Sequence, residues 1–97
     1  MKLEAFKRSL SEEEPLPGLP VYLRALWYDA KGDWERAHAL IQDIADSNGS
    51  WIHAYLHRKG GDAGNAAYWY NRAYKKMPST SLEAEWESLA EHFLNQP

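Results

Sequence analysis

A Gly-Asp pair occurs twice in the sequence, and the spacing of the two pairs limits how the chain can fold. Gly32-Asp33 and Gly61-Asp62 lie 29 residues apart. Glycine tolerates the left-handed backbone that ends many helices, and aspartate caps the first amides of a helix, so each pair predicts a tight turn between two helices. The other positions that match at this offset are Ala25 with Ala54, Ala37 with Ala66, and Tyr22 with the aromatic Trp51. Such repetition predicts stacked helix pairs.

The segment 51–73 is expected to form the second of these pairs, folded back about Gly60-Gly61. Beyond this break one apolar stripe recurs at helical spacing, and it consists of Ala66, Trp69, Tyr70, Ala73 and Met77. The small side chains of Ala66 and Ala73 would let a neighbouring helix approach closely, while Tyr70 fills the space between them.

The other segments also favour helices, and none shows the period-two alternation of a strand. We expect an all-α fold with two helix hairpins, a C-terminal closing helix and a short N-terminal helix. As one domain, the chain divides into an N-terminal segment and linker (1–19), a first hairpin (20–46), a second hairpin (50–77) and a closing helix (80–95). Turns are expected near 31–33, 47–50, 60–62 and 78–80. Ser50 is predicted to cap the third helix, and a Thr80–Glu83 capping box is predicted to open the last.

The composition is that of a small globular domain. Its 97 residues include no cysteine, which excludes disulfides and thiolate chemistry, and no apolar run as long as a membrane span. Since no signal-peptide pattern is present either, we expect a cytoplasmic protein that does not bind a membrane.

The net charge of −3 is unevenly distributed. Residues 51–77 carry five lysines and arginines against one aspartate, a net charge of +4, whereas residues 78–97 carry four glutamates and no lysine or arginine. We therefore expect the last helix to neutralise the second hairpin. The acidic balance also argues against a nucleic-acid partner, because nucleic-acid-binding domains present a net basic face.

His53 and His57 carry the sharpest chemical signal in the sequence. Four residues apart on a helix, they share one face, so both imidazoles could bind one metal ion. The zinc-protease motif has a glutamate directly after its first histidine, where this chain has Ala54. The side chains that could supply a third ligand, if the second helix packs alongside, are His38, Asp33 and Glu35. The alternative is a pair of partly buried, hydrogen-bonded histidines without any cofactor.

The chain is also rich in aromatic residues, with five tryptophans and six tyrosines. Most of them fall on the predicted apolar stripes and are expected in the core. Tyr68 and Arg72 lie four residues apart on the opposite helix face, where a guanidinium can lie over a ring. They form either a solvated surface pair or part of a binding surface, since binding surfaces favour aromatic residues and arginine.

Residues 32–37, Gly-Asp-Trp-Glu-Arg-Ala, resemble the G-D-Y-x-x-A turn of tetratricopeptide repeats. Ala66, Tyr70, Ala73 and Pro78 are similar to the small-aromatic-small-proline spacing of that family's second helix. The period of 29 residues is shorter than the usual period of about 34, which argues against a regular superhelix but not against helix hairpins. The resemblance implies that the first helix of each pair lines a concave surface, with the positions Tyr22, Leu26, Asp29, Trp51, Tyr55, Arg58 and Lys59.

This concave surface would combine aromatic rings with cations, which suits a partner that offers apolar side chains beside carboxylates. The alternative is that two pairs are too few to make a groove. In that case Trp51 and Tyr55 would pack beneath the first pair.

A closer resemblance covers residues 22–73. The run HAYLHRK at 53–59, followed by Gly61-Asp62, Asn65-Ala66 and Tyr68-Trp69-Tyr70, is similar to the signature of a family of small uncharacterised microbial proteins. Glutamate is usual in that family where this chain has Gly60. The resemblance implies a helical fold and brings no chemistry with it.

The sequence contains no Gly-rich phosphate loop, no nucleophile elbow and no Cys-His pair. We therefore expect a non-enzymatic interaction domain that binds a protein, a peptide or a second copy of itself. The alternative is a small-molecule or metal-binding domain, in which a hydrolytic reaction would use His53, His57, Arg58 and Asp62.

Overall fold

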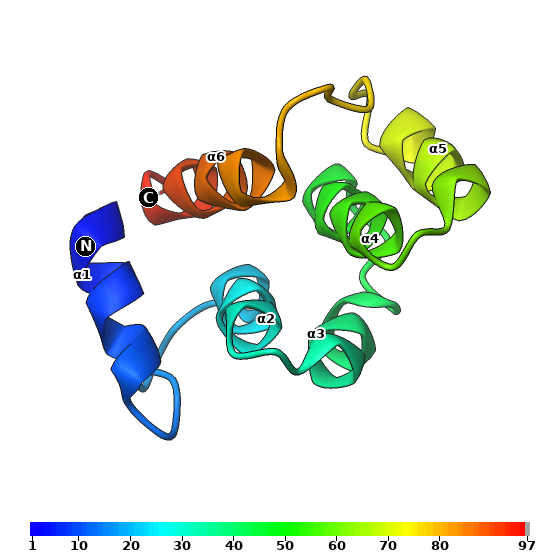
Figure 1. The fold of residues 1–97 in the computed structure, drawn as a ribbon. Coiled ribbons are helices and arrows are strands. Elements are labelled where there is room, and N and C mark those ends of the chain that lie inside the picture. Colours follow the sequence, from blue (N-terminus) through cyan, green and yellow to red (C-terminus); the bar gives the residue numbers. More distant parts are fainter. Residues whose placement is uncertain (97) are drawn as a thin grey trace.

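The computed structural model describes residues 1–96, and within that range it contains helices and no strand (Figure 1). The prediction of an all-α fold is therefore confirmed. The helices are α1 (Leu3–Arg8), α2 (Val21–Ala30), α3 (Trp34–Ile41), α4 (Ser47–Lys59), α5 (Ala63–Arg72) and α6 (Leu82–Leu94), with a 3-10 turn, η1 (Ser9–Ser11), directly after α1.

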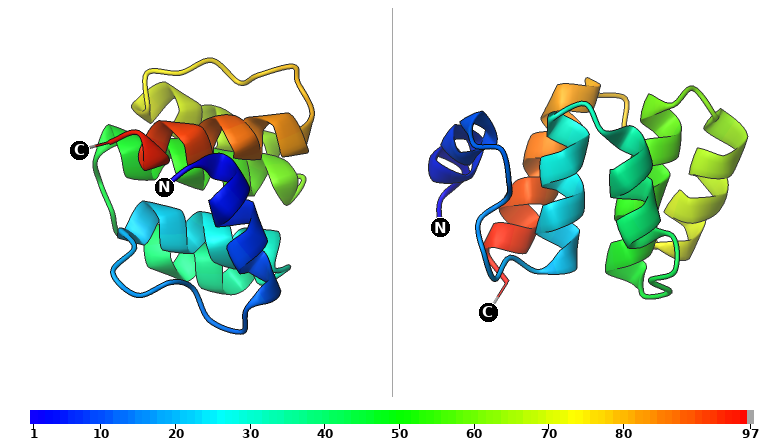
Figure 2. Two further views of the ribbon diagram at one scale, coloured as in Figure 1. Left: turned by 90° about the vertical axis from the view of Figure 1, so that its left-hand side faces the viewer. Right: turned by 90° about the horizontal axis from the view of Figure 1, so that it is seen from below.

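The four central helices form two hairpins, α2 with α3 and α4 with α5, that stack in chain order (Figure 1). Helix α6 runs back along the stack and packs against α2 and α4, the first helix of each pair. Helix α1 packs against α6 in turn (Figure 2). None of the helices among residues 1–96 combines the length and the apolar character needed to cross a bilayer.

The two Gly-Asp turns have nearly identical geometry. Gly32 and Gly61 adopt φ angles of +87° and +81°. The amide that follows each glycine donates to a carbonyl one turn back, Asp33 to Tyr28 and Asp62 to His57, at 2.9 Å in both cases. Each aspartate carboxylate then accepts a bond from an amide in the first turn of the next helix. The predicted repeat is thus present in the backbone itself.

The core lies between α2, α4 and α6. The indole of Trp86 stacks on the ring of Phe6, with 5.8 Å between the ring centroids, the measure used for all ring pairs below. The indole N–H of Trp86 donates to the carbonyl of Leu26 at 2.9 Å. A smaller cluster between α4 and α5 is formed by Ala54, Ala66 and Tyr70. Ala66 has no exposed surface, as the close-approach prediction requires.

Several predicted boundaries are wrong. Residues 47–50 are the first turn of α4, not a loop, because Asp46 caps the helix in place of Ser50 and accepts from the amide of Gly49 at 2.7 Å. Gly49 serves close packing here, since a Cβ would lie 2.6 Å from the carbonyl oxygen of Ile44. The cap of the last helix is Ser81, one residue after the predicted Thr80, and the helix runs from Leu82 to Leu94 instead of over 80–95.

Helices α3 and α5 are also shorter than predicted. α3 ends at Ile41 and α5 ends at Arg72, so the segments 42–46 and 73–77 are not helical. After Ala73 the chain turns through Tyr74, which has a left-handed backbone with φ +59°. Met77, predicted to continue the stripe, therefore lies outside the helix and is 40 % exposed.

The adjacent glycines 60 and 61 should respond in opposite ways to alanine. Gly60 has a helical backbone (φ −75°), and an added Cβ would meet its nearest atom at 3.4 Å, so Gly60→Ala should stabilise the fold by about 0.4–1 kcal/mol. Gly61→Ala forces a side chain into φ +81° and should destabilise it by about 1 kcal/mol or more. Urea midpoints of the two variants measure the difference, and equal midpoints would contradict this turn geometry.

The packing of α5 on α4 can be tested at two neighbouring alanines. Ala66→Leu should overpack the smaller cluster and cost about 1–3 kcal/mol of unfolding free energy. Ala67 is exposed, so Ala67→Leu should change it by no more than about 0.5 kcal/mol. Chemical denaturation provides both values, and an equal loss in the two variants would show that the helix faces are misassigned.

Candidate functional site

Three histidines from two helices meet on one side of the molecule. His38 comes from α3, while His53 and His57 lie one turn apart on α4. One ring nitrogen from each histidine can be chosen so that all three lie within 4.8 Å of one another. The Nε2 atoms of His38 and His53 are 3.1 Å apart. The second helix of the first hairpin, α3, does pack alongside α4. His38 is therefore close enough to act as the third ligand with His53 and His57.

Two tryptophans hold this three-histidine cluster in place. Trp34 lies one turn before His38 and stacks on its ring at 4.8 Å, while its indole N–H donates to the carbonyl of Leu56 at 2.8 Å and ties α3 to α4. Trp69 of α5 stacks on His53 at 4.0 Å. Neither indole was predicted from the sequence to belong to the site. The four-residue spacing of Trp34 and His38 was the available signal for one of them.

The environment of the cluster disfavours protonation. Burial, with smaller contributions from the neighbouring His38 and His57, lowers the pKa of His53 to about 4. Burial also lowers the pKa of His38, with a second contribution from His57. Both rings are therefore neutral near pH 7, the form in which imidazole binds metals.

The cluster contains no carboxylate among residues 1–96. The other third-ligand candidates lie elsewhere, because Asp33 caps α3 and Glu35 is exposed on its first turn. Ala54, next to His53, is fully buried. Among the described residues, then, the cluster offers nitrogen ligands and no group placed as a general base.

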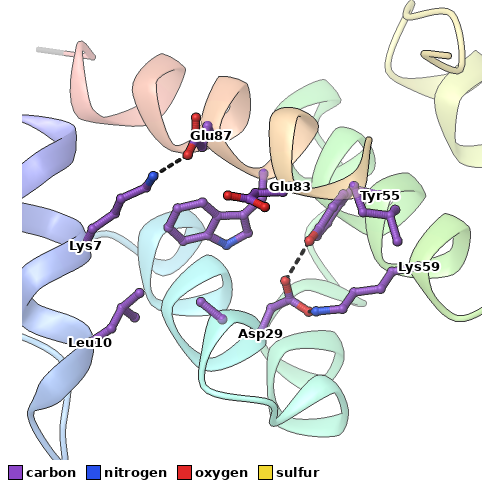
Figure 3. Close-up of a pocket in the computed structure, with 10 residues that line it drawn as sticks. Lys7, Leu10, Asp29, Tyr55, Lys59, Glu83 and Glu87 are labelled. Atoms are coloured by element: carbon purple, nitrogen blue, oxygen red, sulfur yellow. Dashed lines mark hydrogen bonds and ion pairs between the residues drawn. The ribbon is translucent and has the colours of Figure 1, made fainter. Parts of the chain in front are cut away.

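The predicted concave surface is not an open groove. Tyr55 is 2 % exposed, and its hydroxyl donates to Asp29 at 2.9 Å. Burial and the neighbouring Asp29 raise the pKa of this tyrosine. The ammonium of Lys59 pairs with the same carboxylate at 2.9 Å (Figure 3). The structure thus agrees with the alternative in which Tyr55 packs beneath the first pair.

Helix α6 covers the remaining concave positions. The guanidinium of Arg58 pairs with the buried Glu85 at 2.8 Å. Tyr22 stacks on Phe93 at 4.8 Å, and Trp51 contacts the ring of His92 at 5.1 Å. A pocket of about 380 Å³ remains at one end of this covered face, between α1, α2, α4 and α6 (Figure 3).

Tyr68 and Arg72 do lie on the surface. Tyr68 is 53 % exposed, and the guanidinium of Arg72 lies 5.8 Å from its ring and 5.5 Å from that of Trp69. The last helix was expected to neutralise the positive charge of the second hairpin. Within residues 1–96 one salt bridge does so, between Arg58 and Glu85. Within residues 1–96, no salt bridge joins Arg72, Lys75 or Lys76 to an acidic side chain.

Comparison of the chain with known protein families, with curated protein sequences and with solved structures finds no match. We therefore infer function from the geometry of the three-histidine cluster and of the exposed surface near α5.

Arg58 should behave as a structural residue, not as an exposed binding residue. Arg58→Ala would leave the carboxylate of Glu85, whose side chain is 3 % exposed, without its cation, at a cost of about 2–4 kcal/mol of unfolding free energy. Arg8→Ala, at an exposed position, provides the control and should change stability by no more than about 0.5 kcal/mol. Thermal unfolding of both variants measures this, and equal values would show that the Arg58–Glu85 pair contributes nothing.

Proposed function

We propose that this chain is a transition-metal-binding domain whose ligands are His38, His53 and His57. The observation that supports the proposal is the convergence of three imidazole nitrogens within 4.8 Å. The three residues come from two helices whose packing is fixed independently by the bond from Trp34 to the carbonyl of Leu56.

The distances fit an ion after small ring rotations. Zinc binds histidine nitrogens at about 2.0–2.1 Å, so two nitrogens of a tetrahedral site lie about 3.3–3.4 Å apart. The pair from His38 and His53 is already at 3.1 Å, and since all three nitrogens lie within 4.8 Å, His57 has to move inward by up to about 1.5 Å. Because His57 is only partly buried, rotation of its ring would supply this movement while the helices stay in place.

A purely structural histidine cluster explains less of the geometry. A hydrogen bond between neutral rings accounts for His38 and His53. It does not account for His57, whose ring lies 4.9 Å from that of His53 and 5.3 Å from that of His38. Within residues 1–96 the imidazole of His57 makes no hydrogen bond, although its backbone carbonyl accepts one from the amide of Asp62. An ion shared by all three nitrogens gives each ring a partner.

The donor set indicates which ions would bind and what they would do. Three neutral imidazoles suit Zn²⁺, Ni²⁺ and Cu²⁺ and leave one position free for water or an external ligand. Because no carboxylate belongs to the cluster among the described residues, we propose metal binding and not metal-assisted hydrolysis. The ion would also link α3 to α4, and with them the two hairpins.

The direct test is metal binding by the purified full chain. After removal of metal with a chelator, we expect one Zn²⁺ or Co²⁺ per chain by calorimetry, and visible Co²⁺ absorption of the tetrahedral type. Saturating Zn²⁺ should raise the unfolding free energy, by about 2.7 kcal/mol at a hundredfold excess over Kd. Elemental analysis of protein purified without chelators should show the resident metal.

Substitutions at the histidines provide the controls. His38→Gln and His57→Gln should each weaken metal binding at least tenfold, whereas His92→Gln should leave it unchanged, because His92 lies away from the cluster against Trp51 and Phe93. Circular dichroism of each variant confirms folding. Absence of stoichiometric binding in the parent chain, or equal binding by the His38 and His92 variants, would overturn the proposal.

A further inference from the structure

One residue near the end of α5 has a backbone conformation that is unfavourable for its type. Tyr74 has φ +59°, and its side chain is 89 % exposed. It occupies the position after the helix end where glycine is usual, and the amide of Lys75 donates back to the carbonyl of Tyr70 at 3.0 Å. The corresponding turns after α2 and α4 have Gly32 and Gly61 in the left-handed conformation.

A bulky aromatic residue in this position costs conformational free energy, and an exposed ring recovers little of it by burial. Strained backbone positions are found preferentially at functional sites. The strained backbone of Tyr74 therefore suggests that the surface around this side chain has a function.

This surface lies at the outer end of the stack. Helix α5 packs on α4, and its other side faces away from the remaining helices (Figure 2). Besides Tyr74, the exposed apolar side chains here are Tyr68 at 53 % and Met77 at 40 %. Tyrosine, methionine and arginine are the residues enriched at the centre of protein interfaces.

Three cations without acidic partners among residues 1–96 lie at the end of α5 and on the segment that follows it, namely Arg72, Lys75 and Lys76. The ammonium of Lys75 lies 4.4 Å from the ring of Trp51. Trp51 and the two lysines line a recess of about 300 Å³ beside Pro78. Glu85 also lines this recess, but Arg58 and the hydroxyl of Tyr70 already pair with its carboxylate.

We propose that this surface binds an acidic peptide segment of a partner protein. Carboxylates of the segment would pair with Arg72, Lys75 and Lys76, and its apolar side chains would contact Tyr68 and Tyr74 and enter the recess at Trp51. Charge complementarity supports this choice, since the local surface is basic within a chain whose net charge is −3. The proposal does not depend on metal binding by the three-histidine cluster.

The test uses two labelled peptides of equal length, one alternating glutamate with leucine and one alternating glutamine with leucine. Fluorescence anisotropy should show that the acidic peptide binds at least tenfold more tightly at low salt, and that the difference shrinks at high salt. Equal binding of the two peptides would overturn the proposal.

The decisive variant is Tyr74→Gly, because it should change stability and binding in opposite directions. Glycine relieves the backbone strain, so the melting temperature should rise by several degrees. Loss of the aromatic contact should weaken binding of the acidic peptide about tenfold. A stabilised variant that binds the peptide as the parent does would contradict the proposal.

The cations are tested by Lys75→Gln combined with Lys76→Gln, against Lys2→Gln combined with Arg8→Gln. The control pair removes the same charge from exposed positions near the N-terminus. We expect the first pair to weaken binding at low salt about tenfold and the control pair to weaken it less than about twofold. Tighter binding of a single-stranded oligonucleotide, or a dimer of the parent that Tyr74→Gly abolishes, would assign the surface to nucleic acid or to a second copy.

Discussion

Two buried carboxylates determine how the helices are arranged, and both depend on the last turn of α4. Asp29 of α2 is 1 % exposed and Glu85 of α6 is 4 % exposed. A carboxylate buried without a partner would cost several kcal/mol. The adjacent residues Arg58 and Lys59 supply the cations, Arg58 to Glu85 and Lys59 to Asp29. Helix α4 is thereby fixed between α2 and α6, and α6 has to cover the concave side of the stack.

This arrangement decides which surfaces remain for binding. The face that would form a groove in an open repeat is filled by α6, so Tyr55 and Arg58 become structural residues. The opposite side, where His38 of α3 meets His53 of α4, is free of α6. The outer side of α5 is free as well. The proposed metal site therefore lies on α3 and α4. The proposed peptide surface lies on α5, on the segment that follows it, and at the recess beside Trp51 that α6 also lines.

Much of the fold could be predicted from local sequence, and the rest required contacts that no local pattern encodes. The turns at Gly32 and Gly61 were predictable because glycine and aspartate act on their own backbone. The start of α4 was not, since Gly49 packs against Ile44 while its neighbours have turn composition. The spacing of His53 and His57 was readable from the sequence, whereas His38 joins them only through the packing of α3 on α4.

The side chain of Trp69 contacts one residue of each proposed site and so connects the two sites physically. The Trp69 indole stacks on His53 at 4.0 Å, and the guanidinium of Arg72 lies 5.5 Å from the same ring. An ion held by His53 and a carboxylate held by Arg72 would both act on the position of this indole. Any effect of the metal on peptide affinity must then be matched by an equal effect of the peptide on metal affinity, because the coupling free energy is reciprocal.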